Sequence, residues 1–358
     1  MSPTFMIRLD DYQRSSSELA EFITSTWRKS YEGKMTFPLW SAEYFEWQLR
    51  WKNPHFRRNL IAIYDDSRLV ATLLGSEYSF RCGNEILPGS IWSWMTIDPA
   101  YRGQGFAKLL NEERIRRLKD RHIDLVVSYR YFGSKNSLAE RPHRNSGDNT
   151  AKFHNKVGFW VRVLNPQGVW DWSLSSAAAW GARLTSPWAP LPKLGKEENY
   201  IRKATPDDIP QCLELIHEKT NSLPLAIHWD QETLSNQLLG SPLSTTLVYE
   251  REEKIEGFIN FHLLTSFSKC EGQMGLLDVM STQRLSSRKS LYLMYAAMQE
   301  MLNQGAIVAL KLRSGDEDLL LMLRSYFAPR APESHLVMQW IGEEREVPKN
   351  AKTHLLWR

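Results

Sequence analysis

IWSWMTIDPAYRGQGFAKLL, residues 91–110, is the most informative part of this 358-residue chain. It predicts a buried strand that ends at Asp98-Pro99, a turn with glycine at positions 103 and 105, and then an amphipathic helix. Glycine tolerates a positive φ and lets a ligand approach the main chain closely. The free N–H groups and the dipole at the start of a helix favour an anion. The turn therefore suits a pyrophosphate, and Arg102 adds a formal positive charge beside it.

These residues resemble the central motif of the GNAT superfamily, whose members are acyltransferases that use acetyl-coenzyme A. The family motif is Arg/Gln-x-x-Gly-x-Gly/Ala, preceded by a strand that ends in an apolar residue, one further position and a proline. Arg102, Gly105 and Ala107 fill the motif, and Ile97 and Pro99 fill its approach. A dinucleotide-binding Gly-x-Gly-x-x-Gly would require glycine at position 108, where lysine stands, and the P-loop pattern is absent. An ordinary strand-turn-helix with incidental glycines is the alternative.

The resemblance implies that acetyl-coenzyme A is the co-substrate and that no metal takes part. It also implies which residues hold the coenzyme. In the family, the turn and the start of the helix bind the pyrophosphate; here these residues are Arg102, Gly103, Gln104, Gly105, Phe106 and Ala107. Family members also splay the preceding strand at a bulge. This implies that the main chain of Met95, Thr96 and Ile97 binds the pantetheine arm and the thioester carbonyl. Asn149 is expected to hydrogen-bond the pantetheine arm or to order the loop before it.

NTAKFHNKVGFW, residues 149–160, is a second match to the family. It predicts a short helix closed by Gly158 in the left-handed conformation, with Phe159 beginning the next strand. Many family members have a tyrosine four residues before this glycine, and it protonates the departing coenzyme A thiolate. This chain has His154 there, and histidine can donate a proton near neutral pH. The resemblance implies His154 as general acid; a helix histidine without a chemical role is the alternative.

An amine acceptor must lose a proton before it attacks a thioester, because its pKa in water is near 10. A carboxylate or a histidine can accept that proton. Glu77, on the strand before the turn at 81–84, is the candidate general base, with a solvent-facing strand residue as the alternative. The region 27–56 would supply an aromatic wall for the acceptor, although such spacing is also typical of a core. Its aromatic residues are Trp27, Tyr31, Phe37, Trp40, Tyr44, Phe45, Trp47, Trp51 and Phe56.

Composition sets limits on the class of protein. A content of 42% hydrophobic and 24% charged residues is typical of a soluble globular protein. No apolar run reaches the ~18 residues that a membrane span needs, and no signal pattern opens the chain. Three scattered cysteines favour neither a disulfide framework nor a zinc site, and a net charge of +4 does not favour nucleic acid. We expect a cytoplasmic protein without a membrane span; the sequence leaves its oligomeric state open.

Length and pattern predict two domains. Residues 181–199 are rich in proline and glycine and read as a linker between a domain at 1–180 and a domain at 200–358. The second half repeats the β-β-β-α-β-α order of the first. Its counterpart of the glycine turn is QRLSSRK, residues 283–289, where side chains would fill the space of a pyrophosphate. The resemblance thus implies an α/β (layered α+β) class with two tandem GNAT folds, each a mixed, mostly antiparallel twisted sheet flanked by helices, the second degenerate.

The function implied is an N-acyltransferase. It would move an acetyl group from acetyl-coenzyme A to the primary amine of a small molecule, an amino sugar or a peptide, by direct attack on the thioester. One alternative is a non-catalytic acyl-coenzyme A sensor, which the missing tyrosine and the degenerate copy favour. The other is an enzyme for longer acyl chains, carried by coenzyme A or an acyl-carrier protein, which the aromatic wall favours.

Overall fold

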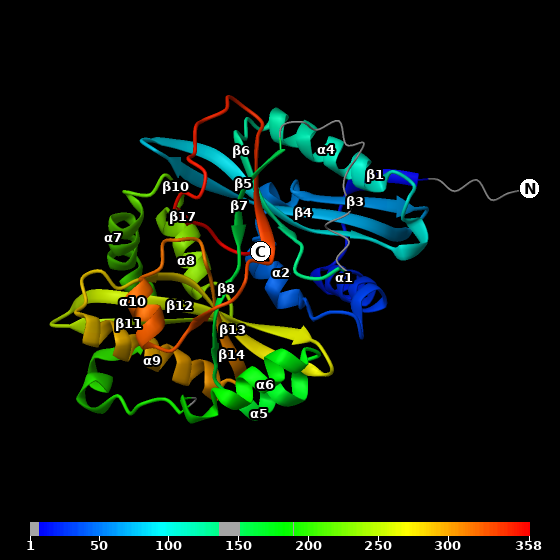
Figure 1. Ribbon diagram of the computed structural model, residues 1–358. Coiled ribbons are helices and arrows are strands. Elements are labelled where there is room, and N and C mark those ends of the chain that lie inside the picture. The colour runs from blue at the N-terminus through cyan, green and yellow to red at the C-terminus, as the bar shows by residue number, and fades with distance from the viewer. Residues whose placement is uncertain (1–6, 136–150, 189) are drawn as a thin grey trace, which may run out of the picture.

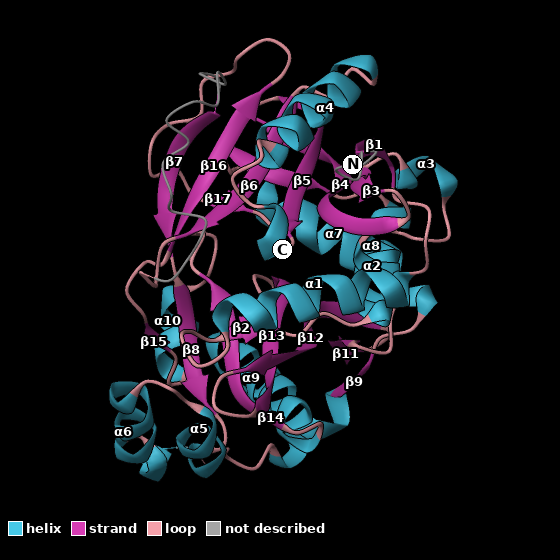
Figure 2. Ribbon diagram, turned by 90° about the vertical axis from the view of Figure 1, so that its right-hand side faces the viewer, coloured by secondary structure: helices cyan, strands magenta, loops and turns pink. Residues whose placement is uncertain are grey.

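Two twisted sheets with helices on their faces make up the protein (Figures 1 and 2). The computed structural model describes residues 7–135, 151–188 and 190–358. The first sheet has the order β1-β3-β4-β5-β6-β16-β7, with β10 beside β4 and β17 beside β10. Its strands are β1 (Ile7–Asp11), β3 (Leu60–Asp65), β4 (Arg68–Cys82), β5 (Glu85–Ile97), β6 (Leu125–Tyr131), β7 (Ala151–Val157), β10 (Leu225–His228), β16 (Ser334–Trp340) and β17 (Thr353–His354).

The second sheet has the order β15-β8-β14-β13-β12-β11-β9, and β2 pairs with β12. Its strands are β2 (Phe37–Pro38), β8 (Phe159–Val163), β9 (Ile201–Lys203), β11 (Ser244–Arg251), β12 (Lys254–Phe267), β13 (Glu271–Ser281), β14 (Ala306–Leu312) and β15 (Ala328–Pro329). Most neighbours in both sheets are antiparallel, whereas β5 with β6, β10 with β17 and β13 with β14 are parallel. The predicted fold class is confirmed.

Helices cover the sheets and fill the space between them. They are α1 (Ser16–Tyr31), α2 (Ala42–Gln48), α3 (Pro54–Arg57), α4 (Phe106–Asp120), α5 (Pro166–Trp172), α6 (Ser176–Leu184), α7 (Ile209–Thr220), α8 (Gln231–Leu239), α9 (Ser287–Asn303) and α10 (Leu319–Arg324). Helix α4 lies on the outer side of the first sheet, while α1 crosses between the two sheets (Figure 2). Helices α5 and α6 form a pair beside the second sheet (Figures 1 and 2).

The same order of elements occurs twice along the chain. In the first half it is β3-β4-β5-α4-β6, and in the second half β11-β12-β13-α9-β14. In each case the strand after the helix is parallel to the strand before it. Such a connection places the helix across a face of its sheet. The predicted repeat is therefore present as far as the strand after the helix, but among the described residues its last helix occurs only in the second half, as α10.

Strands are exchanged between the two halves of the chain. Strand β16, from the second half, lies between β6 and β7 of the first sheet. Strand β8, from the first half, pairs with β14 in the second sheet. The expected division at 181–199 therefore follows the order of the chain but does not separate the two sheets. Part of that segment is also regular, since α6 continues to Leu184 and a 3₁₀ helix spans Gly195–Tyr200.

One buried cluster joins the two sheets. It contains Phe80 and Leu125 from the first sheet, Phe258 and Val279 from the second, and the fully buried Trp229. Burial of large apolar side chains contributes about 1.5–3 kcal/mol each, so this cluster favours one arrangement of the sheets. The cluster thereby fixes the position of the two sheets, and of the faces they present to each other beside it.

The aromatic region before residue 57 is mainly core. Tyr44, Phe45 and Trp47 are buried and pack in one cluster with Trp94 of β5. Tyr44 and Phe45 meet Trp94 edge to face, with ring centroids 6.1 and 5.6 Å away. The core interpretation of the helical spacing is correct for these residues.

Candidate active site

Strands β5 and β6 separate in the middle of the first sheet. They pair only at Gly89–Leu125, Ser90–Val126 and Ile91–Val127. Beyond that point β5 continues to Ile97 and β6 to Tyr131 without pairing with each other. The main-chain groups that face this opening lack a strand partner there, so they are available to a ligand.

A bulge redirects β5 at this opening. The register with β4 shifts between Thr72 and Leu74, so Trp94 and Met95 together face one residue of β4. Trp94 adopts a φ of 53°, which is uncommon for a bulky residue. Buried aromatic neighbours hold it in this conformation. The bulge expected from the family resemblance is thus present, immediately before Thr96 and Ile97.

The turn before α4 is open to solvent. Gly103 and Gly105 have φ values of 81° and 84°, and a Cβ at either position would meet no atom within 4 Å. Gly105 is the N-cap of α4, and no side chain caps the helix there. The first N–H groups of a helix have no acceptor within the helix itself. This end of α4 therefore presents main-chain donors to whatever binds in front of it.

The corresponding position in the second half is closed. Ser286 caps α9, and its hydroxyl accepts a hydrogen bond from the Lys289 N–H at 3.4 Å. Leu285 packs toward the neighbouring strand, where a Cβ on Gly257 would lie 2.6 Å from it. Side chains thus occupy the position that is open at α4, as the sequence predicted.

Arg102 joins three elements near the opening. Its Nη2 donates to Ser30 Oγ of α1 at 2.7 Å, and its Nε donates to the Ile97 carbonyl oxygen at 3.2 Å. The guanidinium therefore fixes the end of β5 against α1. Phe106 is buried and stacks on Tyr101, so only its main chain is available to a ligand.

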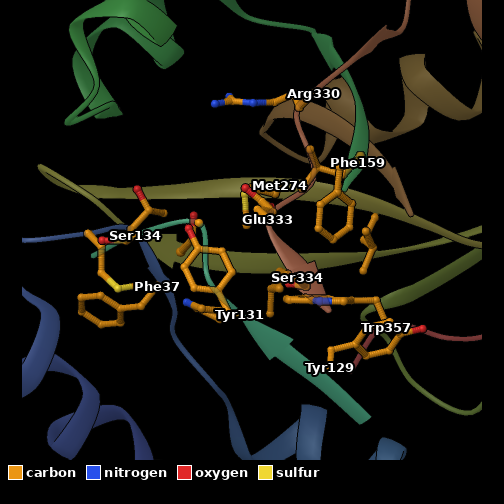
Figure 3. Close-up of a pocket in the computed structure, with 18 of the residues that line it drawn as sticks. Phe37, Tyr129, Tyr131, Ser134, Phe159, Met274, Arg330, Glu333, Ser334 and Trp357 are labelled. Carbon is orange, nitrogen blue, oxygen red and sulfur yellow. The ribbon is translucent and has the colours of Figure 1, made fainter. Parts of the chain in front are cut away.

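A cavity of about 2070 Å³ extends from the opened strands to the second sheet (Figure 3). Of the residues predicted to hold the coenzyme, Met95, Thr96, Ile97, Arg102 and Ala107 line it. Gly103, Gln104, Gly105 and Phe106 precede and begin α4 outside this lining. Asn149 lies outside the described residues. Trp27, Tyr31, Phe37 and Trp40 also line the cavity, so part of the predicted aromatic wall is present.

The segment around His154 differs from the prediction. Residues 151–157 form strand β7, not a helix, and pair with β16. This long-range pairing overrides the local helical pattern. Gly158 is not left-handed; its lack of a Cβ instead allows the main chain at Ala331 to approach.

His154 itself is not placed for proton transfer in the cavity. It is not among the residues that line the cavity, and its Nε2 is buried without a partner among the described residues. Burial lowers the pKa of its imidazole. The structure thus places His154, the general acid that the resemblance implies, outside the lining of the cavity.

The carboxylate of Glu77 also interacts with neighbouring side chains away from the cavity. It pairs with Arg121, at the end of α4, and accepts a hydrogen bond from Asn59 Nδ2 at 3.3 Å. His55 Nε2 lies 3.4 Å from its other oxygen. Glu77 does not line the cavity. The structure thus places Glu77, the predicted general base, in an ion pair away from the lining of the cavity.

Two residues not identified from the sequence face the cavity. Tyr129 lies on β6 beyond the point where the strands separate, and its buried hydroxyl has no partner among the described residues. Burial raises the pKa of this hydroxyl well above its usual value. Figure 3 shows Tyr129 beside Trp357. Alternation along the strand places Tyr131 on the same face, which is a signal that the sequence did contain.

Glu333 is the one carboxylate side chain among the described residues that line the cavity. It directly precedes β16, and its main-chain oxygen accepts hydrogen bonds from the N–H groups of Phe132 and Gly133. Burial raises the pKa of its carboxyl, and attraction to Arg330 offsets this only in part. No local pattern marks Glu333, because strand exchange alone brings it to β6.

The described residues contain no group of His, Cys, Asp and Glu side chains arranged to hold a metal ion. Likewise, none of the helices in the described ranges is long and apolar enough to cross a membrane.

Comparison with known proteins agrees with this geometry. The family model described as an acetyltransferase (GNAT) domain matches residues 12–132. Saccharomyces cerevisiae N-myristoyltransferase with bound myristoyl-CoA has a similar fold: its TM-score is 0.76 at 16% identity, over 100% of this chain and 92% of that one. No curated protein sequence matches the chain.

Two further solved structures are more distant. A GCN5-related N-acetyltransferase from Kribbella flavida has a TM-score of 0.52 at 15% identity, over 94% of this chain and 71% of that one. A probable N-acyltransferase from Enterococcus faecalis has a TM-score of 0.51 at 11% identity, over 94% and 73%. At these identities the likeness is one of fold. The family model thus identifies a GNAT acetyltransferase domain in residues 12–132, and the solved structures show that the fold of the whole chain is like that of N-acyltransferases.

Proposed function

We propose that this protein transfers an acyl group from a coenzyme A thioester to a primary amine. The observation that carries the proposal is the junction of an uncapped, glycine-opened helix with a bulged strand that has parted from its neighbour. In this proposal residues 102–107 hold the pyrophosphate. The main chain of Met95, Thr96 and Ile97 holds the pantetheine arm and the thioester carbonyl, and Asn149 contributes to the pantetheine site.

The reaction is a direct attack on the thioester. The amine nitrogen forms a bond to the carbonyl carbon, and the main-chain donors near the bulge stabilise the resulting oxyanion. Removing a donor of this kind costs about 2.7–4 kcal/mol in other enzymes. Glu333 accepts the proton that the nitrogen releases. The carbon–sulfur bond then breaks, and Tyr129 donates its proton to the leaving thiolate.

The environments of the two side chains suit these roles. A general acid must hold its proton until the thiolate leaves, and a phenol is protonated at neutral pH because its ordinary pKa is near 10. A general base works best when its pKa lies closer to the working pH, and burial raises the pKa of Glu333 in that direction. Both side chains line the cavity that the opened strands enter.

We propose acetyl as the acyl group that is transferred. Behind the bulge, Tyr44, Phe45 and Trp94 are buried and packed against one another, which leaves little room for a long chain on that side. A longer donor is the second candidate, because the cavity of about 2070 Å³ exceeds the needs of an acetyl group. The yeast N-myristoyltransferase structure contains myristoyl-CoA, which supports the same alternative.

Product analysis tests the proposal. Purified protein would be incubated with acetyl-CoA, and separately with octanoyl-CoA, against a panel of primary amines. Mass spectrometry of the amide and assay of the free thiol report transfer. We expect amide and thiol in equal amounts, with the acetyl donor preferred. Binding of both donors without amide or thiol release would instead identify a sensor, and preference for octanoyl would identify a long-chain enzyme.

A further inference from the structure

We infer, on the basis of the proposed function, that the acceptor is an amphiphile: a primary amine carrying a hydrocarbon chain. The chain would lie along the face of the second sheet, between Glu333 and helix α6. This assigns the part of the cavity that lies beyond the thioester site.

An apolar floor extends along this part of the cavity. On β8 the half-exposed residues Val161 and Val163 alternate with the buried Trp160, Arg162 and Leu164. Alternate strand residues share a face, so Phe159, Val161 and Val163 form one line. The neighbouring strands continue the same surface, and all of these residues line the cavity. They are Leu264, Met274, Leu276, Val308 and Leu310.

The floor is long enough for an alkyl chain of medium length. From Phe159 to Val163 the strand advances four residues, which is roughly 13 Å at the usual rise of a strand. A shorter acceptor such as ethylamine would leave most of this surface in contact with water. Binding of a chain removes both apolar surfaces from water, which is favourable in proportion to the area buried.

Helix α6 closes the far end with small side chains. Ala178, Gly181 and Ala182 line the cavity from this helix. A Cβ at Gly181 would meet no atom within 4 Å, so there is open space in front of the helix. Val169 and Trp172 of α5 add apolar surface, and the Trp172 Nε1 proton is already donated to the Ser266 carbonyl oxygen at 3.3 Å. The end of the groove is therefore both apolar and unfilled.

A carboxylate stands at the near end of the floor. The main chain of residues 330–333 runs beside the start of β8: Arg330 N donates to Phe159 O, and Glu333 N donates to Val157 O, each at 2.9 Å. Glu333 is thus next to Phe159, the first residue of the floor. Figure 3 shows Glu333, Met274 and Phe159 on the wall of the same cavity.

This order of charge and apolar surface fits the acceptor better than the donor. An alkylamine places its nitrogen at Glu333 and its chain on the floor. A donor acyl chain that followed the same path would pass the carboxylate with no polar group to offer it. Burying a polar group without a hydrogen-bond partner is costly, so the amine is the favoured occupant.

A series of n-alkylamines tests the inference. Ethyl-, butyl-, hexyl- and octylamine would be compared at saturating acetyl-CoA by release of free thiol. Burial of a methylene is worth ~0.8 kcal/mol, so KM should fall about fourfold for each methylene that reaches the floor. A KM that does not depend on the amine, together with a dependence on the length of the donor acyl chain, would overturn the inference.

A substitution at the end of the groove gives a second readout. Gly181→Leu fills the open space in front of α6, and leucine favours a helix more than glycine does. It should reduce the KM advantage of octylamine over butylamine by tenfold or more. The matched control is Ser176→Leu, which places the same side chain at an exposed position of α6 outside the cavity. An advantage that survives Gly181→Leu would contradict the assignment of the chain to this groove.

Calorimetry without coenzyme separates the inference from the proposed function. Octylamine that binds more tightly than butylamine, but is never acylated, would overturn the proposed function and keep an alkyl ligand in the groove. Transfer to ethylamine and octylamine with equal KM would support the proposed function and overturn the amphiphilic acceptor.

Discussion

Tyr129 is the residue on which the proposed chemistry depends for its proton. Its hydroxyl is buried and faces the cavity where the two strands part. Tyr129→Phe keeps the ring and removes the proton, so we predict that kcat falls by about 10² or more, as general acids contribute 10²–10⁴. A steady-state assay of thiol release measures kcat of the variant and of the unmodified protein.

His154→Phe is the control for this substitution, because His154 lies outside the cavity. It should leave kcat near that of the unmodified protein. The opposite pattern, with His154→Phe inactive and Tyr129→Phe active, would reverse the assignment of the acid.

Glu333 gives a prediction about pH. The general base must be ionised, so kcat should rise with pH through a carboxyl pKa that burial has raised. Glu333→Gln should remove this rise and lower kcat by about 10²–10⁴. A pH–rate profile of both proteins measures the effect; an unchanged rising limb in the variant would exclude Glu333 as the base.

The raised pKa of the Glu333 carboxyl also makes the stability of the folded protein depend on pH. A raised pKa means that the folded protein binds the proton more tightly than the unfolded chain does. The carboxyl therefore favours the folded state most below its unfolded pKa of ~4.3, and this contribution is lost as pH rises through the folded pKa. Thermal unfolding should show the unmodified protein losing stability relative to Glu333→Gln as pH increases over that interval.

How far sequence predicts a residue's role depends on the range of its contacts. Gly103 and Gly105 were predictable because a positive φ is a local demand that glycine meets. Glu333 was not, because only the pairing of β16 with β6 and β7 brings it to the cavity. The position of His154 outside the cavity lining was not predictable for the same reason, since its strand is set by β16.

At the scale of elements, two glycines of helical segments differ in the backbone conformation that each must adopt. Gly105 caps α4 with a φ of 84°, whereas Gly181 lies inside α6, and a Cβ at either position meets open space. Gly105→Ala should destabilise the protein by about 1–2 kcal/mol, the cost of a left-handed residue with a Cβ. Gly181→Ala should stabilise it by up to about 1 kcal/mol.

Urea unfolding of the two variants measures this contrast. A similar loss of stability from both would contradict the account of α4, because packing does not distinguish the two positions.

Elements with strong local signals, such as α4 and α9, were predicted correctly. Strand β7 was not, because its pattern resembles a helix until β16 lies beside it.

At the scale of the whole molecule, a buried ionic network joins the second sheet to residue 358. Asp278 Oδ1 lies 3.1 Å from Arg358 Nη1, and His262 Nδ1 lies 2.7 Å from Asp278 Oδ2. Gln237 Nε2 donates to the same carboxylate at 2.9 Å. The Ser93 hydroxyl of β5 in turn donates to the main-chain oxygen of Arg358. The second sheet therefore contributes to the shape of the site in the first.

Removal of Asp278 should be costly. Asp278→Ala leaves the Arg358 charge buried and unpaired, and we predict a loss of about 3–5 kcal/mol. The exposed ion pair of Asp120 with Arg116 provides the control. Asp120→Ala should change stability by less than about 1 kcal/mol. Equal effects in denaturant unfolding would contradict a structural role for the network.

The network also predicts the response to acid. Burial alone would raise the pKa of the Asp278 carboxyl, but attraction to Arg358 and His262 outweighs it and holds the pKa below its usual range. The stability that this carboxylate contributes is thus present above the unfolded pKa of ~3.9 and is lost as pH falls through the folded value. The Asp278→Ala variant should lack this part of the acid transition.

The repeat of β-β-β-α-β was predictable because its hydrophobic pattern is local and occurs twice. The exchange of β8 and β16 between the sheets was not, since many registers would satisfy the same alternation. The open turn at α4 and the Ser286 cap at α9 follow from local sequence, and they make the two halves unequal. We therefore propose, as the consequence, one coenzyme site per chain.

Calorimetric titration with acetyl-CoA, applied to the unmodified protein and to two variants of Gly105, tests this consequence most directly. Asparagine and aspartate both tolerate the left-handed conformation, so Gly105→Asn and Gly105→Asp differ mainly in the negative charge placed against the pyrophosphate. We predict one site per chain, retained in Gly105→Asn and lost in Gly105→Asp. Two sites, or equal binding by both variants, would contradict a single coenzyme site at the start of α4.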